Sequence, residues 1–447
     1  MITSSACEPA GTPGPVTVLP AAHGCETLGY STQGRPLTVY YCGNPGASVR
    51  IFIMAGQHGD EPETCQAAAE FVSRCVAGAF RAEVHAGVLV DANPDGAIAG
   101  TRRNAQDSDL NRDHLLLLEP ETAAVHAFVD SWKPDIVIDV HTYRPWRREL
   151  MAFDMVFPQE IMIDFPTNPA ISTSLGSALQ RKAIEFVEGR MAKANVRSDR
   201  YTIIRSGIVR HSNTDIVDAR NGLALRFAIP TVLIEGRRSS PDDSLIFTPP
   251  AVALLRSIEA AVEWAVAHAK QLRNRPSGCK KEEMVPVRCR YTGSRTARHM
   301  EMQSASKGEI ARIRIPGKYL SSVQATSFIR LPGAYGVPRN LTGVLALLRR
   351  HGLESASPEA FRSSATEVYG IEAMTPAGEA DAPAIPTCSA RKQSLNLDDF
   401  VLFPATQTGG RLMALLIEPE SQFGPSRVPE LAETLLPGAT YPIVRVV

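Results

Sequence analysis

The sequence is poor in cysteine, and its cysteines follow no recognisable pattern. The 447 residues include eight cysteines, which are scattered and form no Cys-x-x-Cys pair. This distribution argues against a disulfide framework and against a zinc site built from thiolates, because both need suitably spaced cysteines. We therefore expect buried, reduced thiols at Cys7, Cys25, Cys42, Cys65, Cys75, Cys279, Cys289 and Cys388.

Net charge and long apolar runs are also missing. Lys and Arg together number 47, as do Asp and Glu, so no global field would attract nucleic acid or an anionic membrane. The first residues lack the basic start and apolar stretch of a secretory signal, and no run of about 18 apolar residues occurs elsewhere. We expect a soluble, cytoplasmic protein without nucleic-acid or membrane partners, and its oligomeric state stays open.

The chain is longer than one hydrophobic core usually organises, which favours two domains. Between Val49 and Lys270, apolar strand-like runs alternate with amphipathic helical patterns, as in a mostly parallel sheet covered by helices. The strand candidates are RIFIMAG, AGVLVDANP, DIVIDVH and IPTVLIEG. We predict an α/β fold over residues 1–275, with a mixed, mostly parallel sheet flanked by helices.

The remainder of the chain has a different pattern. The segment RNRPSGCKKEEM, rich in charge and broken by Pro and Gly, predicts a linker over residues 276–290. Shorter alternating runs follow, which predict a smaller α+β or β-rich domain over residues 291–447. Within it, residues 372–393 are rich in Ala, Pro and Ser and predict an exposed loop.

Polar residues follow two of the predicted strands at the point where each strand ends. His58 and Glu61 lie directly after RIFIMAG, and His141 ends DIVIDVH, two residues after Asp139. Open α/β sheets place their sites at this edge, and imidazole and carboxylate groups are both competent zinc ligands. The pattern predicts one metal ion held by His58, Glu61 and His141, with Asp139 supporting His141 from behind. Alone, each of these short patterns occurs often by chance.

A third strand also ends in a carboxylate. Glu235 closes IPTVLIEG, and a glutamate beside a catalytic metal can take a proton from water and pass it to a leaving amine. The alternative is a solvated glutamate at the end of a strand.

The order of the motifs makes the metal site specific. After GYSTQGRPL come GQHGDE, NPDG, the pair RRN, DLNR, a strand ending in Asp-x-His, and LIEG. Over roughly residues 27–270 this series resembles the M14 family of zinc metallocarboxypeptidases, which are related to the succinylglutamate desuccinylase and aspartoacylase group. The resemblance implies a zinc carboxypeptidase-like fold and one Zn²⁺ on His58, Glu61 and His141.

The resemblance also implies roles for the residues between the ligands. Asp109 would hydrogen-bond His58, and Asn111 with Arg112 would bind the terminal carboxylate of a substrate. Arg102 would polarise the scissile carbonyl, with Arg103 as its nearest competitor. Glu235 takes the place of the catalytic base. A guanidinium is suited to these tasks because its fork of N–H donors matches a carboxylate.

The family's mobile-loop tyrosine has no counterpart in residues 211–227, and Tyr201 and Tyr143 stay unassigned alternatives. The stretch that leads to IPTVLIEG would line the pocket for the substrate's terminal side chain. It holds three arginines, Arg210, Arg220 and Arg226, and one of them in the pocket would favour an acidic side chain.

Three functions are compatible with these residues. The first is a hydrolase that releases a C-terminal amino acid from a peptide or small conjugate with a free carboxylate, and NPDG and RRN favour it. The second is an N-acyl amino acid amidohydrolase of the desuccinylase and aspartoacylase type. The third is a zinc- or peptide-binding module without catalysis, which the presence of Glu235 and Arg102 disfavours. The C-terminal domain resembles, loosely, an extra domain of some bacterial members of the family, and its role stays open.

Overall fold

A computed structural model describes residues 24–80, 83–173, 175–238, 247–276, 278–294, 296–315, 317–375 and 384–447. Cys7, the segment inspected for a signal, and the middle of the loop predicted over 372–393 lie outside these residues. The other seven cysteines lie at partly or fully buried positions.

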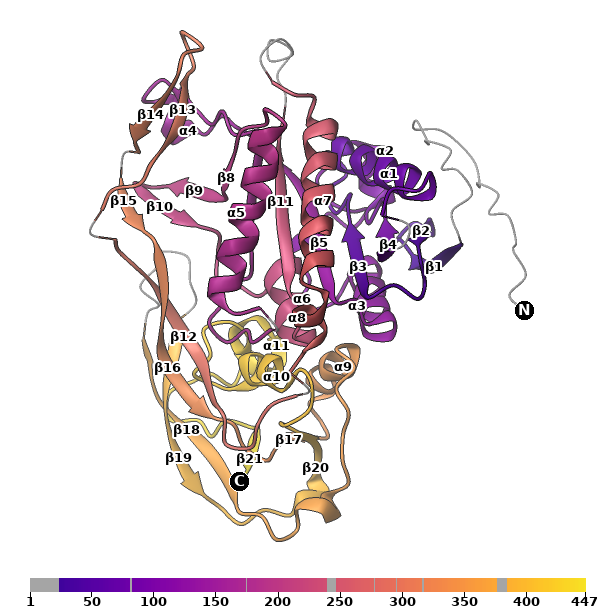
Figure 1. Ribbon diagram of the computed structural model, residues 1–447. Coiled ribbons are helices and arrows are strands. Elements are labelled where there is room, and N and C mark those ends of the chain that lie inside the picture. The colour runs from indigo at the N-terminus through magenta and orange to yellow at the C-terminus, as the bar shows by residue number, and fades with distance from the viewer. Residues whose placement is uncertain are drawn as a thin grey trace.

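The first part of the chain is built on one eight-stranded sheet with the order β1-β2-β4-β3-β5-β11-β7-β8 (Figure 1). Its strands are β1 (Cys25–Tyr30), β2 (Pro36–Gly43), β3 (Val49–Met54), β4 (Val84–Leu89), β5 (Ile136–Tyr143), β7 (Ile161–Asp164), β8 (Ser198–Arg200) and β11 (Thr231–Arg237). The central strands β4, β3, β5 and β11 run parallel. Strand β2 pairs antiparallel with β1 and β4, and β7 pairs antiparallel with β11 but parallel with β8. The predicted mixed, mostly parallel sheet is confirmed.

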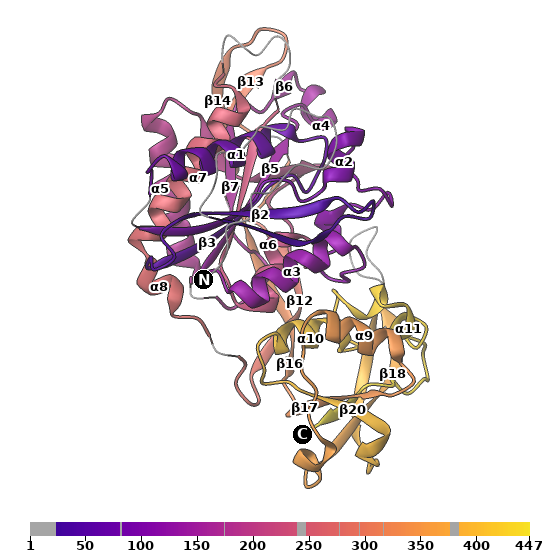
Figure 2. The same ribbon diagram turned by 90° about the vertical axis from the view of Figure 1, so that its right-hand side faces the viewer.

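Helices cover both faces of this sheet, as Figure 2 shows with the sheet nearly edge-on. On one face lie α1 (Pro62–Val76), α5 (Ser177–Lys193), α7 (Pro250–Ala267) and α8 (Ala269–Arg273), and on the other lie α3 (Pro120–Trp132) and α6 (Ala219–Phe227). Shorter helices, α2 (Pro94–Ala99) and α4 (Arg148–Met151), and the 3-10 turn η1 (Leu110–Arg112) lie in the connections.

The apolar runs of the sequence form the central strands because these strands are buried on both faces. In β3, Ile51 and Ile53 pack in the core beneath α1, α5 and α7, while Phe52 and Met54 pack against α3 and α6. Parallel strands with two buried faces read as continuous apolar segments, and their polar residues are confined to the ends. The ends of β3, β5 and β11 therefore carry the side chains available for chemistry.

The C-terminal part is rich in strands and has its own core. One sheet, in the order β19-β18-β21-β17-β20, consists of β17 (Ala334–Pro338), β18 (Thr366–Thr375), β19 (Ile385–Lys392), β20 (Phe400–Pro404) and β21 (Val444–Val446). It is accompanied by α9 (Thr342–Arg350), α10 (Gly410–Ile417), α11 (Pro429–Ala432) and the 3-10 turns η3 (Pro358–Phe361), η4 (Leu397–Asp399) and η5 (Pro425–Arg427). Its core also contains Leu115, Ile216 and Leu225, so the two parts share buried contacts.

The boundary between the two parts differs from the predicted one. Strand β12 (Met284–Thr292) begins inside the expected linker and pairs with β16 (Ser322–Arg330). Between these strands the chain returns to the first part: β13 (His299–Ser304) pairs with β14 (Ile310–Arg314) and with β6 (Met155–Val156). Similarly, β15 (Lys318–Leu320) joins β10 (Ile208–His211), which pairs with β9 (Thr202–Arg205). Strands β13, β14 and β15, expected in the C-terminal domain, thus extend sheets of the N-terminal part.

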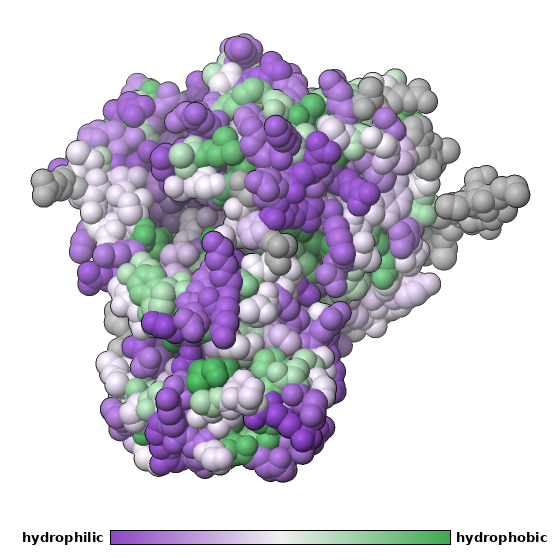
Figure 3. Space-filling view, turned by 60° about the horizontal axis from the view of Figure 1, so that its bottom comes forward, coloured by the Kyte–Doolittle hydropathy of each residue, from purple (hydrophilic) through white to green (hydrophobic). Residues whose placement is uncertain are grey.

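The predicted loop over 372–393 is also different. Its described residues complete β18 and form β19, which pair antiparallel from Glu367 opposite Lys392 to Thr375 opposite Ile385. The small and polar composition suits β19 because most of its side chains are exposed. On the face drawn in Figure 3, hydrophilic residues predominate and hydrophobic ones form small groups. No described helix is both long and apolar enough to cross a bilayer.

Candidate metal centre

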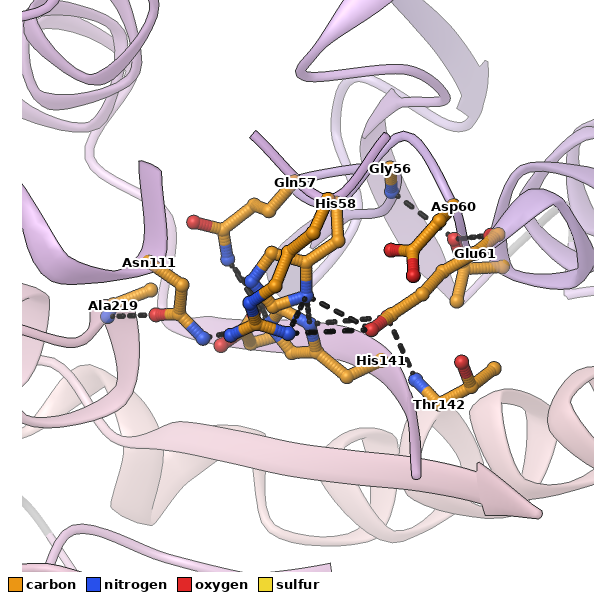
Figure 4. Close-up of polar contacts among 12 residues, drawn as sticks. Gly56, Gln57, His58, Asp60, Glu61, Asn111, His141, Thr142 and Ala219 are labelled. Atoms are coloured by element: carbon orange, nitrogen blue, oxygen red, sulfur yellow. Dashed lines mark hydrogen bonds and ion pairs between the residues drawn. The ribbon is translucent and has the colours of Figure 1, made fainter. Parts of the chain in front are cut away.

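The three predicted ligands converge at one edge of the sheet. His58 and Glu61 lie in the turn between β3 and α1, His141 lies on β5, and Figure 4 shows their side chains pointing toward one another. One ligand atom from each lies within 4.8 Å of the other two, and all three side chains are buried. His58 Nδ1 and His141 Nδ1 are 3.2 Å apart, and His58 Nδ1 is 2.9 Å from Glu61 Oε1. Both histidines therefore direct Nδ1 inward.

The outer nitrogen of each histidine faces an aspartate. His58 Nε2 lies 3.2 Å from Asp109 Oδ1, and His141 Nε2 lies 3.0 Å from Asp139 Oδ1. A carboxylate at Nε2 accepts a hydrogen bond from the N–H of that nitrogen, which keeps the proton on Nε2 and leaves the Nδ1 lone pair free to face a metal. The predicted support of His58 by Asp109 and of His141 by Asp139 matches this geometry.

Glu61 is held by two further groups. The backbone N–H of Thr142 donates to Glu61 Oε2 at 2.8 Å, and Arg238 Nη2 donates to Oε1 at 3.1 Å. Arg238 also donates to Asp60 and to the Thr142 hydroxyl. These bonds fix the plane of the Glu61 carboxylate.

The electrostatics of the cluster follow from its burial and its charges. Burial alone would raise the pKa of Glu61, but hydrogen bonds from His141 and His58 hold that pKa well below its usual range. Burial alone would lower the pKa of His141, yet the charge of Asp139 and the bonds to Asp139 and Glu61 raise that pKa well above normal. The carboxylates thus concentrate negative charge where a cation would bind.

The donor set fits a divalent metal. Two imidazole nitrogens and a carboxylate, each oriented by a hydrogen bond behind it, form the three-ligand arrangement that zinc occupies in catalytic sites. Among the described residues this is the only group of three or more such side chains with ligand spacing.

Glycines in the motifs GQHGDE and NPDG allow the turn between β3 and α1 to pack closely against α2. An added Cβ at Gly59 would lie 1.9 Å from the carbonyl carbon of Gly96, so the backbones of GQHGDE and NPDG touch directly. Asn93 caps α2 by accepting from Gly96 N, and its Nδ2 donates to Gln57 O. Asp95 accepts hydrogen bonds from Ser31 and Gln33 of GYSTQGRPL. These motif residues position the turn and have no contact with the ligand atoms.

Arg102, and not Arg103, reaches the metal centre. Arg102 Nη1 lies 3.2 Å from His58 Nδ1, and its Nε and Nη2 both donate to Asp109 Oδ2. Arg103 instead donates to the carbonyl of Asp107 on the exposed side of the loop. Of the two candidates, Arg102 occupies the position beside the ligands.

Asn111 and Arg112 lie in the 3-10 turn that Asp109 caps. Asn111 is buried, with Nδ2 3.1 Å from His141 Nε2 and Oδ1 accepting from the N–H of Ala219. Arg112 is exposed at the rim. Their binding of a substrate carboxylate stays a prediction.

Glu235 lies beside the metal ligands on the adjacent strand. In the parallel register of β11 and β5, Glu235 is paired with His141. Its side chain is partly buried and has no hydrogen-bond partner in the described part of the chain. Burial raises the pKa of Glu235 to about 7, with the negative charge of Glu61 adding to the effect and the histidines opposing it. This carboxyl is poised to exchange protons near neutral pH.

The two tyrosine candidates differ in burial and in hydrogen bonding. Tyr143 is buried, and its hydroxyl donates to the carbonyl of Gln159. Tyr201 is partly exposed, and burial raises the pKa of its hydroxyl, with Glu235 adding to the effect. Glu235 also raises the pKa of the Tyr143 hydroxyl, so both tyrosines stay alternatives for the mobile-loop tyrosine.

The three candidate specificity arginines have different surroundings. Arg226 is buried and donates to the carbonyls of His351 and Thr408 in the C-terminal part. The guanidinium of Arg210 lies over the ring of Tyr291 at 4.5 Å. Arg220 is buried beside Ala219, and its Nη2 donates to Asn213 O. Its Nε and Nη1 have no partner in the described part of the chain.

Three residues of the site were not predicted from the sequence. Gln57 and His114 form a buried hydrogen bond behind His141, and Arg238 binds Glu61. Gln57 belongs to the motif GQHGDE and Arg238 lies two residues after LIEG, and this closeness was the available signal. His114 gave no signal because its partner lies far away in the sequence.

Comparison with known proteins agrees with the motif order. No family model matches the chain. It is 23% identical to carboxypeptidase 2 of Trichophyton rubrum over 213 residues, which cover 44% of this chain and 40% of that protein. The carboxypeptidase 2 of Trichophyton equinum is also 23% identical, over 215 residues, with the same coverage. The match thus spans less than half the length of these curated relatives.

Solved structures with similar folds include a metallo-carboxypeptidase from Pseudomonas aeruginosa (20% identity, TM-score 0.42, covering 56% of this chain and 66% of that one). Another is the murein-tripeptide amidase of Escherichia coli O157 (18% identity, TM-score 0.34, covering 58% and 95%). The sequence matches and the ligand geometry together confirm the resemblance of this chain to the metallocarboxypeptidases.

Proposed function

We propose that this chain is a zinc-dependent hydrolase that releases the C-terminal amino acid from a peptide or small conjugate. The observation that carries the proposal is the convergence of His58 Nδ1, His141 Nδ1 and the Glu61 carboxylate beside the partly buried Glu235. When bound, a zinc ion on these ligands would supply a Lewis acid that activates water and polarises a carbonyl.

The chain's own residues would divide the remaining tasks. Glu235 would accept a proton from the attacking water and deliver it to the departing amine, for which a pKa near 7 is suitable. Arg102, beside His58, would stabilise negative charge on the carbonyl oxygen. Asn111 and Arg112 would hold the terminal carboxylate and so place the last peptide bond at the metal.

A finer proposal concerns the side chain of the released residue. Arg112 and Arg147 at the rim and the buried Arg220 all act electrostatically on the Tyr201 hydroxyl, which also faces Glu235. One arginine suffices for the terminal carboxylate, whereas Arg220 keeps two donor nitrogens without partners in the described chain. Buried donors of this kind favour a second carboxylate. We infer a preference for substrates that end in an acidic residue.

The proposed function is tested with purified protein whose bound metal is quantified. We expect about one zinc per chain and turnover of peptides with a free C-terminus, with much slower turnover of the same peptides amidated at that end. Turnover of N-acyl amino acids alone would instead favour the amidohydrolase.

The decisive variant is Glu235→Gln. It should retain zinc and lose roughly 10²–10⁴-fold in kcat, the usual contribution of a general base. The exposed Glu433→Gln serves as the matched control and should keep full activity. An unchanged rate in Glu235→Gln would refute the assignment of the base.

A further inference from the structure

A row of buried polar side chains leads from the metal centre toward the C-terminal part. It runs from His141 through Asp139, Gln57 and His114 to His126 on α3, and each of these side chains is almost inaccessible to water. Figure 4 shows Gln57 extending from the turn of His58 toward His141. Nothing in the proposed reaction uses Gln57, His114 or His126.

The hydrogen bonds in this row have a defined direction. Gln57 Nε2 donates to Asp139 Oδ1 at 2.7 Å, which turns Gln57 Oε1 toward His114 Nε2 at 2.9 Å. Because an amide oxygen only accepts, His114 must carry its proton on Nε2. His114 Nδ1 is then an acceptor, and His126 Nε2 donates to it at 3.1 Å. Burial keeps this arrangement neutral by lowering the pKa of His114 to about 4.

Asp139 connects this row of hydrogen bonds to the metal ligand His141. Its Oδ1 accepts from Gln57 and also lies 3.0 Å from His141 Nε2, while its Oδ2 has no partner among the described residues. A buried carboxylate with only two side-chain donors depends on each of them for its rotation. Gln57 therefore orients Asp139, and Asp139 keeps the proton of His141 on Nε2 and its Nδ1 free for metal.

The C-terminal part holds the segment that carries His114. His351, which directly follows α9, donates from Nε2 to the carbonyl of Leu115 at 2.8 Å, and Arg350 donates to the carbonyl of Leu116 at 3.1 Å. The ring of His351 also packs 5.6 Å from the ring of His126. From the other side, Gly222 on α6 leaves the space that His114 needs, since an added Cβ there would lie 2.9 Å from His114 Cβ.

We propose that Gln57 and His114 are positioning residues for the metal ligand His141, and that the C-terminal part supports them through His351. The proposal rests on the metal binding in the proposed function and is independent of the substrate. The C-terminal part would then support the metal centre, although it contributes none of the three ligands.

The test compares the zinc affinity of His114→Phe and His114→Gln, measured by competition with a chelator in the absence of substrate. His114→Phe removes the donor to Gln57 and should weaken zinc binding by roughly 10- to 100-fold. His114→Gln can place an amide N–H near the lost donor and should recover most of that affinity. The visible spectrum of the Co²⁺-loaded protein should change in the Phe variant and return toward wild type in the Gln variant.

Both substitutions disturb the same buried place, so the thermal unfolding of the metal-free variants is measured as well. It shows whether a loss of zinc affinity is explained by a loss of stability. The proposal would be overturned if folded His114→Phe bound zinc as tightly as wild type, or if His114→Gln failed to restore the lost affinity. If His114→Phe does not fold, Gln57→Met removes the same link from the other side and should weaken zinc binding similarly. His351→Phe should have a smaller effect in the same direction. A wild-type chain that binds no zinc would refute the proposed function instead.

Discussion

At the scale of single residues, the carboxylates behind the histidines decide how firmly the metal is held. Asp109 is bonded to His58 and to Arg102, and these partners hold its pKa below the usual range although burial opposes them. Asp109 therefore stays ionised and orders a ligand and a cation together.

We expect Asp109→Asn to weaken zinc binding by roughly 10-fold or more, because an amide keeps the shape but loses the charge that polarises His58. Competition with a chelator measures the change. Asp107→Asn, at an exposed position of the same loop, is the control and should leave the affinity unaltered. A loss shared equally by both variants would contradict the role of Asp109.

A second prediction concerns the titration of Glu235 in the metal-free protein. Its pKa of about 7 in the fold exceeds the ordinary value, so between roughly pH 4.5 and 7 the unfolded chain is ionised while the folded chain stays protonated. The free energy of unfolding therefore falls as pH rises through that window, because the folded protein resists ionising this carboxyl. Above about pH 7 the loss of stability is complete. Metal-free Glu235→Gln should be more stable than wild type by about 3 kcal/mol at pH 8 and nearly equal at pH 4.5.

Urea unfolding at the two pH values, with ¹³C NMR of the glutamate carboxyls, checks this. A Glu235 signal that titrates near pH 4.5, with no pH-dependent gain in the Gln variant, would show that the carboxyl is not desolvated.

A third prediction tests the acidic preference. Wild type should cleave substrates that end in Glu faster than those that end in Phe or Lys. Arg220→Met should reduce Glu turnover by roughly 10- to 100-fold and leave Phe turnover almost unaltered, since only the acidic substrate would lose a charged partner. Arg210→Met is the matched control. Equal rates on all three substrates in wild type, or a preference for Lys, would exclude the idea.

The sequence predicted residues whose role follows from a local motif, and it failed where a partner is distant. His58 and Glu61 follow a buried strand and His141 lies near the end of another, and they were recognisable from that pattern. Gln57 and His114 meet only through the fold, and no local periodicity marks their contact. The surroundings of Arg226 had no local signal either, because its partner His351 lies more than a hundred positions away.

At the scale of elements, the turn after β3 owes its shape to contact with α2. The backbone of Gly59 meets that of Gly96, leaving no room for any side chain. The turn with two metal ligands and the loop with Arg102 are thereby held together.

Gly59→Ala should destabilise the protein by about 2–4 kcal/mol and weaken zinc binding, because a Cβ at this place overlaps rigid backbone. Gly46→Ala, whose Cβ would meet only a side-chain oxygen at 3.4 Å, should change stability by less than about 0.5 kcal/mol. Differential scanning calorimetry distinguishes the two. Similar small shifts in both variants would mean that the two backbones can separate freely.

Element prediction succeeded where burial is uniform and failed where pairing is long-range. The apolar runs of β3, β5 and β11 identified the central strands because both faces are covered. The exposed strand β19 has no apolar alternation, and only its partner β18 makes it a strand.

At the scale of the whole molecule, histidines lie buried where the two parts meet. Burial lowers the pKa of His351 to about 3. The pKa of His126 is held well below its usual value by burial and by the charges of His114, His351 and Arg226. Arg226 and Arg350 also disfavour charge on His351. The folded protein therefore contains neutral imidazoles where the unfolded chain would bind protons below about pH 6.5.

The stability that depends on these histidines is fully present above about pH 6.5 and is lost as pH falls toward their folded pKa values. We expect the free energy of unfolding to fall by about 1–2 kcal/mol per histidine between pH 7.5 and 5.5. Urea titrations of wild type and His126→Phe measure it, and the variant should lose less stability over this range. The same pH dependence in both proteins would assign the effect to other groups.

The return of the chain between β12 and β16 has a consequence for the order of synthesis on the ribosome. The eight strands of the main sheet are complete once β11 has emerged, but β6 and β10 still lack partners that come from β13 and β15. A nascent chain released at residue 275 would expose these strand edges to other chains. The N-terminal part thus completes these sheets only after residue 320, and exchanging the C-terminal part between homologues requires two junctions, one in each strand of the β12–β16 ribbon.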